Sequence, residues 1–88
     1  MFGLTSQVRR AAVLIPCNLA EGRGRGSRAE LARFAHIALG SVCELDTLLL
    51  IAAELDLAGA SDVTALRDRL PSLSRQISKY IEDRKPSA

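Results

Sequence analysis

The chain has 88 residues, enough for a single domain over 1–88, and combines an apolar fraction of 48% with only 3% aromatic residues. Because a domain this small buries only ~60–65% of the surface of its unfolded chain, spare apolar surface is expected to lie against partner subunits. The net charge is +2 and His36 is the only histidine, so without a cluster of cysteine and histidine we expect neither a metal nor a cofactor.

The first predicted helix covers about residues 5–21, with Thr5 or Ser6 as its N-cap. Pro16 lies inside this segment, where it removes one backbone hydrogen bond and is expected to bend the helix. Apolar residues recur at the spacing of one helix face. They are Val8, Ala11, Ala12, Ile15 and Leu19.

The second predicted helix is the longest and covers about residues 28–57. Ser27 and Glu30 have the spacing of a capping box, in which each side chain accepts from the other residue's backbone amide. Apolar positions alternate steps of three and four, the period of a long helix in a left-handed bundle. This seam comprises Leu31, Phe34, Ala38, Ser41, Leu45, Leu48, Ala52 and Leu55.

A second stripe flanks that seam, which indicates that the second helix is covered on more than one side. It comprises Ala35, Leu39, Val42 and Leu49. Gly40 lies in the middle of the helix, where glycine costs ~1 kcal/mol relative to alanine. We therefore expect another helix to approach closely at Gly40, with Ser41 beside it hydrogen-bonded to a carbonyl one turn earlier.

The third predicted helix covers about residues 62–83, with Gly59 ending the second helix and Ser61 as the new cap. Its apolar seam includes Leu66, Leu70 and Ile77, and Pro71 predicts a kink. The tail, residues 85–88, is expected to fray. No segment alternates like a strand, so the sequence predicts an all-α, up-and-down antiparallel helical bundle.

Charge is segregated along the chain. Residues 1–33 hold six arginines and two glutamates, residues 34–66 hold five acids and no lysine or arginine, and residues 67–88 hold six basic and three acidic residues. Short loops make neighbouring helices antiparallel, so Arg84 and Lys85 should lie near the loop at residues 22–28. Each protomer is therefore expected to have one basic end and one acidic end.

Cys17 and Cys43 do not form a CxxC pair. Two such cysteines in a chain without a secretory leader indicate buried, small apolar residues in a reducing compartment, so we expect a cytoplasmic protein. The two lie at different heights of the first helical hairpin, which argues against a disulfide between them. The apolar runs are interrupted within about ten residues, short of the ~20 needed to cross a membrane.

Two blocks carry a resemblance to a known family. Residues 3–22 read GLTSQVRRAAVLIPCNLAEG, and residues 37–47 read IALGSVCELDT. The chain resembles the bacterial four-helix-bundle proteins of intervening sequences in 23S rRNA genes over about residues 2–81. The resemblance implies a helical bundle that forms ring-like homopentamers. The family usually has a further helix before the first block, where this sequence starts. Either the start of the gene is placed too late, or this member dispenses with the helix, or another subunit replaces it, and a genuine loss would leave a groove.

The chain also resembles the related accessory variability determinant protein of diversity-generating retroelements. That protein is a basic pentameric bundle that binds nucleic acid and a reverse transcriptase. The resemblance therefore implies a fold and an assembly, and leaves the activity of this chain open.

The strongest functional candidate is the glycine-rich loop, residues 22–28, with Arg23, Arg25 and Arg28. Arginine side chains can each fork onto a phosphate, and the loop ends at a helix N-terminus, which attracts anions. Arg84 and Lys85 would extend this basic face. The alternative is a flexible, solvated loop whose arginines aid solubility.

Two further groups stand out. Arg9 and Arg10 are expected to reach Glu44 in an ion pair that fixes helix register or a subunit contact, because a carboxylate in an apolar helix usually pairs with a cation. No nucleophile or base accompanies Glu44, so we expect no catalytic residue. Asn18 and Glu21 lie one turn apart, where they would cap backbone groups around the loop or shape the edge of a binding site.

These observations predict a non-enzymatic oligomer, a pentamer on family grounds, that binds RNA or DNA through a basic face. The alternative is a structural assembly or a scaffold for a protein partner, without nucleic-acid binding. A nuclease would need an acid cluster or a pair of histidines, and the sequence has neither. We expect no membrane partner.

Overall fold

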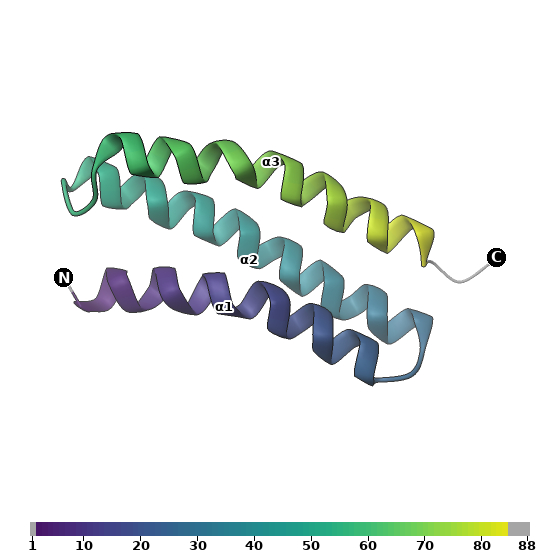
Figure 1. Ribbon diagram of the computed structural model, residues 1–88. Helices are drawn as coiled ribbons and strands as arrows, with labels where there is room; N and C mark the ends of the chain where they lie inside the picture. The colour runs from purple at the N-terminus through teal and green to yellow at the C-terminus, as the bar shows by residue number, and fades with distance from the viewer. Residues whose placement is uncertain (1, 85–88) are drawn as a thin grey trace.

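The computed structural model describes residues 2–84 and consists of three helices: α1 (Phe2–Gly24), α2 (Arg28–Glu54) and α3 (Ala60–Asp83). Residues 2–84 contain no strand, so the all-α prediction is confirmed. The helices run alternately up and down, with α2 between the other two (Figure 1). Lys85 and the tail predicted to fray, residues 85–88, lie outside the described residues.

The helix α1 is longer at both ends than the sequence predicts. It begins at Phe2, so Thr5 and Ser6 lie inside the helix and the predicted N-caps are wrong. Its helical backbone continues through Pro16 and ends only at Gly24. The glycine-rich segment is therefore partly helical, and the link to α2 is only residues 25–27.

The start of α2 confirms half of the capping box. Ser27 has an extended backbone and its Oγ accepts a hydrogen bond from the Glu30 amide at 3.1 Å. The Glu30 carboxylate does not return this bond to Ser27. It accepts instead from Arg33 Nε at 2.6 Å, one turn further along the helix.

The connection between α2 and α3 differs from the prediction. The helix α2 ends at Glu54 and the chain then reverses at Asp56, whose φ of 59° is left-handed. Aspartate tolerates this conformation better than most residues, which explains why the helix stops before Leu57. Gly59 is the residue that precedes α3, so Ser61 lies within the first turn and is not the cap.

The three helices form an open layer. The helix α2 packs closely against both neighbours, whereas the backbones of α1 and α3 stay apart from each other within residues 2–84. The molecule accordingly measures 48 × 23 × 14 Å and is thin in one direction. Three helices of this length could have closed around a common axis, but here the apolar side shared by α1 and α3 stays uncovered.

The core follows the inner face of α2. Both predicted stripes of this helix contribute to it, with Ala35 and Ala38 completely buried. The main cluster joins residues of all three helices: Ile15, Ala35, Val42, Leu49, Val63, Leu70, Ile77 and Ile81. The prediction that α2 is covered on more than one side is thus confirmed.

The close approach between helices of this chain occurs at Gly22, and no other helix of the described chain approaches Gly40, where the sequence predicts one. A Cβ atom added to Gly22 would lie 2.9 Å from the Phe34 Cβ and 3.2 Å from backbone atoms of Leu31. Gly40 is exposed, and a Cβ there would meet no atom of the described chain within 4 Å. Ser41, its neighbour, is buried.

The helix α2 is also long and apolar enough to cross a bilayer by length and composition alone, the one such helix in the described part of the chain. The interrupted apolar runs of the sequence did not predict a helix of this length and composition. A helix that is covered on two sides in a water-soluble protein meets the same criterion. The absence of a membrane partner therefore stays a prediction.

Candidate functional site

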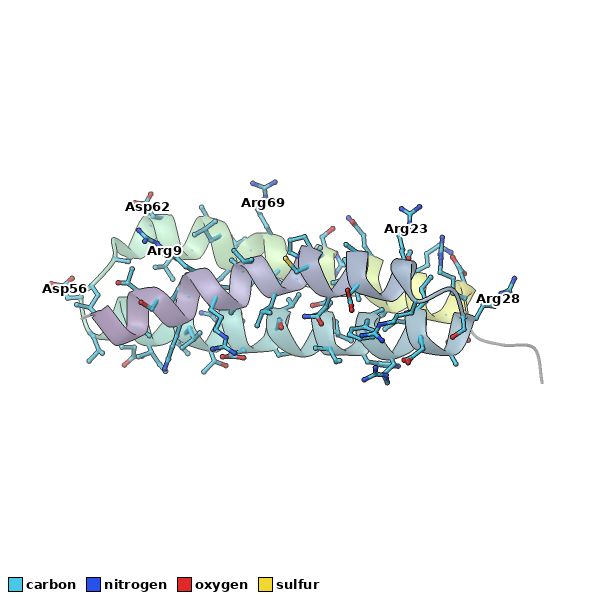
Figure 2. All side chains as sticks on the ribbon, turned by 90° about the horizontal axis from the view of Figure 1, so that it is seen from below. Arg9, Arg23, Arg28, Asp56, Asp62 and Arg69 are labelled. Carbon is cyan, nitrogen blue, oxygen red and sulfur yellow. The ribbon has the colours of Figure 1, made fainter. Side chains whose placement is uncertain are left out.

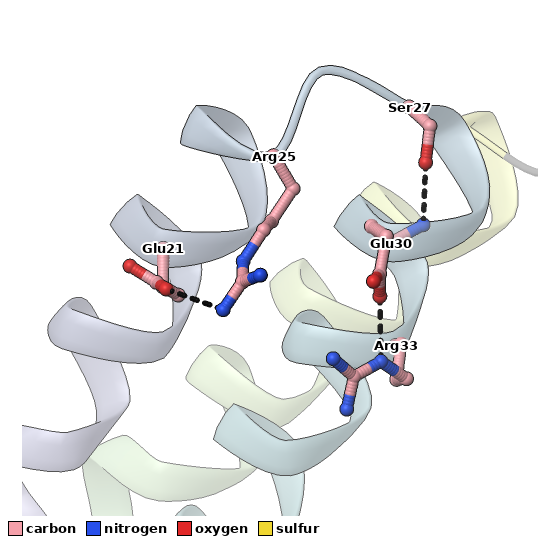
Figure 3. A network of polar contacts seen from close by, with 5 residues as sticks. All are labelled: Glu21, Arg25, Ser27, Glu30 and Arg33. Atoms are coloured by element: carbon pink, nitrogen blue, oxygen red, sulfur yellow. Dashed lines mark hydrogen bonds and ion pairs between the residues drawn. The ribbon is translucent and has the colours of Figure 1, made fainter.

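The basic turn between α1 and α2 is short and locally ordered (Figure 3). The amide of Arg25 donates to the Gly22 carbonyl at 3.3 Å, and Gly26 takes a positive φ of 82° that allows the chain to reverse. Ser27 then caps α2. The loop that the sequence predicts to be flexible is therefore a tight turn of three residues.

The three arginines of this turn are not equivalent. Arg25 donates to Glu21 Oε1 at 2.9 Å (Figure 3). Its guanidinium lies 5.1 Å from the centre of the Phe34 ring. Arg23 and Arg28 are exposed, and no described carboxylate forms an ion pair with either of them. Among these three, Arg23 and Arg28 therefore remain available to an anionic partner.

Phe34 anchors the positive charge beside the turn. The Arg33 guanidinium lies 4.4 Å from the ring centre, so the ring contacts two cations. The hydrogen bond from Arg33 holds the pKa of the Glu30 carboxyl below its ordinary value. Glu30 therefore stays ionised and offsets part of the positive charge at this end.

The two ends of the molecule differ in charge as the chain direction predicts. The end of α3 lies beside the α1–α2 turn (Figure 1), which brings Arg84 to that end. The Arg84 guanidinium lies 3.9 Å from the centre of the Tyr80 ring. Asp56 and Asp62 lie at the opposite end (Figure 2).

The structure does not bring Arg9 or Arg10 into an ion pair with Glu44. All three side chains are exposed, and none of the ion pairs of the described chain includes them. Glu44 lies on the face of α2 that points away from both other helices, which is why the expected pair does not form within one chain.

Asn18 and Glu21 do not cap the turn's backbone as predicted. Asn18 Nδ2 donates to the Leu14 carbonyl at 2.7 Å, one turn earlier in α1. Glu21 binds the Arg25 side chain instead of a backbone amide. Glu21 therefore pairs with one arginine of the turn, whose side chain stays about half exposed.

The expectation that both cysteines are buried is wrong. Cys17 and Cys43 are exposed free thiols, because each lies off the inner stripe of its helix. Within the residues that the structure describes, no three side chains of the metal-binding types gather at one place. Cys17 and Cys43 are therefore not joined in a disulfide within the described residues.

The sequence did not predict the ion pair between α2 and α3. Arg67 Nε donates to Asp46 Oδ1 at 2.8 Å, and its second nitrogen lies 3.4 Å from Oδ2. This hydrogen bond holds the pKa of the Asp46 carboxyl below its ordinary value of 3.8. The residues are 21 apart, so no local spacing signals the contact.

An apolar groove lies between α1 and α3, and α2 forms its floor. Leu45 and Leu49 of α2 lie at the bottom, with Val8 of α1 and Leu66 of α3 on either side. Two further hollows share lining residues with it, one toward each end of the molecule. We call these three hollows together the "α1–α3 groove".

Arginines line the rim of the α1–α3 groove. Arg69 lines its centre, Arg9 one end and Arg23 the other. All three lie on the same side of the molecule (Figure 2). Asp68 is an acid that also lines the centre, so the rim is predominantly but not wholly basic. The sequence pattern does not predict this arrangement, because it depends on how each helix is rotated about its axis.

Three antiparallel helices, an uncovered apolar groove and an arginine-bearing turn define a small all-α protein. The chain belongs to the family described as 23S rRNA-intervening sequence protein, whose family model matches residues 1–79. The resemblance predicted from the two sequence blocks is therefore confirmed. Neither a curated protein nor a solved structure matches the chain.

Proposed function

We propose that this protein is a non-enzymatic, self-associating helical scaffold. The observation that carries the proposal is the separation of α1 from α3, which leaves the apolar α1–α3 groove open to water. Leu66 on its side is 51% exposed, and Leu57 at its end is 47% exposed. Contiguous apolar surface of this kind typically marks a contact with another protein.

Self-association is expected to be visible by light scattering on the purified chain at micromolar concentration. The scattering mass should correspond to several copies of the 9.5 kDa chain and should fall on dilution. Apolar association also stabilises the folded state by mass action, so the melting temperature should rise with protein concentration. A monomer whose melting temperature does not depend on concentration would contradict the proposal.

A second activity, binding of RNA or DNA at the α1–α2 turn, is favoured by a separate observation. Arg23 and Arg28 are exposed there without an acidic partner among residues 2–84, and Arg84 lies at the same end. Assembly of several copies with these ends on one face would multiply the positive potential. Few aromatic side chains are available for base stacking, so the binding would depend on phosphate and not on sequence.

Fluorescence anisotropy with short RNA and DNA duplexes tests this second activity. Affinity should fall steeply with salt, because each neutralised phosphate releases a counterion. Arg28→Glu should weaken binding several-fold and reduce the slope against log salt by about 0.9 per lost contact. Arg75→Glu is the matched control, since Arg75 is exposed on α3 away from the turn and changes the net charge equally.

Two outcomes would contradict nucleic-acid binding. One is a parent protein that fails to bind at low salt, and the other is an equal loss for Arg28→Glu and Arg75→Glu. Either result would leave a scaffold for a protein partner as the function of the assembled chain.

A further inference from the structure

The face of α2 that points away from the core forms a second exposed surface. Ile37, Gly40, Glu44, Thr47 and Ile51 are three or four residues apart, which places them on one side of the helix. All five are exposed, while the opposite side of α2 holds the core. We call these five residues, together with Glu54 three residues after Ile51, the outer face of α2.

The outer face combines apolar contact area with negative charge. Ile37 is 42% exposed and Ile51 is 40% exposed, and nothing in the described chain lies within 4 Å of a Cβ placed on Gly40. Another helix could thus approach closely there. Glu44 and Glu54 are the charged groups of this face, and residues 34–66 contain no lysine or arginine.

The α1–α3 groove is complementary to the outer face in apolar surface and in charge. Its floor is apolar, and its rim carries Arg9, Arg23 and Arg69 against one acid, Asp68. None of the three arginines forms an ion pair among residues 2–84. The outer face of α2 offers a helical ridge with isoleucines for the floor and glutamates for the rim. Neither surface is used within the chain.

We infer that the α1–α3 groove of one copy receives the outer face of α2 of a second copy. This inference rests on the proposed self-association and names its partner surface. Charge disfavours the two symmetric alternatives, since groove on groove would bring two predominantly basic rims together and outer face on outer face would bring two acidic faces together. The contact is therefore heterologous and repeats from copy to copy, into a ring or an open chain.

Charge reversal on each surface tests the inference. The groove variant is Arg9→Glu/Arg69→Glu, the outer-face variant is Glu44→Arg/Glu54→Arg, and a third protein carries all four changes. The four side chains are exposed and unpaired in the described chain, so each variant should keep its helical circular dichroism. Arg28→Glu/Arg75→Glu is the control, with the same charge change as the groove variant outside both surfaces.

Each double variant is expected to associate at least about tenfold more weakly than the parent in sedimentation velocity, because like charges then oppose each other. The four-fold variant should regain assembly, since both charges of each contact are inverted together. An equimolar mixture of the two double variants should also assemble, whereas the control should resemble the parent.

The outcomes separate the two proposals. A monomeric parent would overturn self-association itself. An oligomeric parent whose outer-face variant assembles normally would keep the scaffold but overturn this contact. A four-fold variant that stays dissociated while remaining helical would also overturn the pairing.

Discussion

Replacing Gly22 by leucine is expected to lower the free energy of unfolding by about 1–3 kcal/mol, because added volume at a packed contact forces neighbouring groups to move. A Cβ atom at Gly22 would already lie 2.9 Å from the Phe34 Cβ and 3.2 Å from the Leu31 Cα and carbonyl oxygen. The Leu31 atoms belong to the backbone, so α1 and α2 would have to separate. Urea denaturation followed by circular dichroism measures the change.

Gly40 provides the matched control on the same pair of helices. In the dissociated chain, Gly40→Ala should raise the free energy of unfolding by up to ~1 kcal/mol, because alanine favours helix and no atom of the described chain lies within 4 Å of the new Cβ. The two substitutions should therefore act in opposite directions. A Gly22→Leu protein as stable as the parent would show that the helices do not meet there.

The second large effect is expected at Ile77, where truncation to alanine should cost about 2–5 kcal/mol of unfolding free energy. Ile77 is 3% exposed and belongs to the cluster that joins α3 to the other helices. The lost side chain leaves a cavity that a thin layer of helices can only partly close. The midpoint of urea denaturation should fall accordingly.

Val13→Ala is the control for this truncation. Val13 is 58% exposed on α1, so its loss should change stability by no more than ~0.5 kcal/mol. Similar shifts for Ile77→Ala and Val13→Ala would contradict the position of α3 on the core.

The sequence pattern was sufficient to predict the three helices and their relative direction. The two apolar stripes of α2 predicted that it would contact both neighbours, because a 3.5-residue period keeps those positions on one side over the whole helix. Antiparallel order predicted that Arg84 would lie near the α1–α2 turn. The ends of the helices were less predictable, since the reversal at Asp56 and the helical run through Gly24 depend on backbone geometry.

Contacts between side chains on different helices could not be predicted. One residue corresponds to a rotation of 100° about a helix, so counting along the hairpin gives the height of a residue but not its direction. Glu44 and Arg10 illustrate the error, because the expected pair does not form and Glu44 faces outward. Gly22 and Gly40 show the same ambiguity, since glycine marks either a close approach or an uncovered position.

The open layer has a consequence for how the chain comes apart. Since the backbones of α1 and α3 each pack only against α2 within residues 2–84, either outer helix can detach while the backbone of the other stays packed on α2. Local opening of this kind exposes backbone amides at a lower free energy than global unfolding. The amide hydrogens of α1 and α3 should therefore exchange with solvent first, and those along the middle of α2 should exchange last.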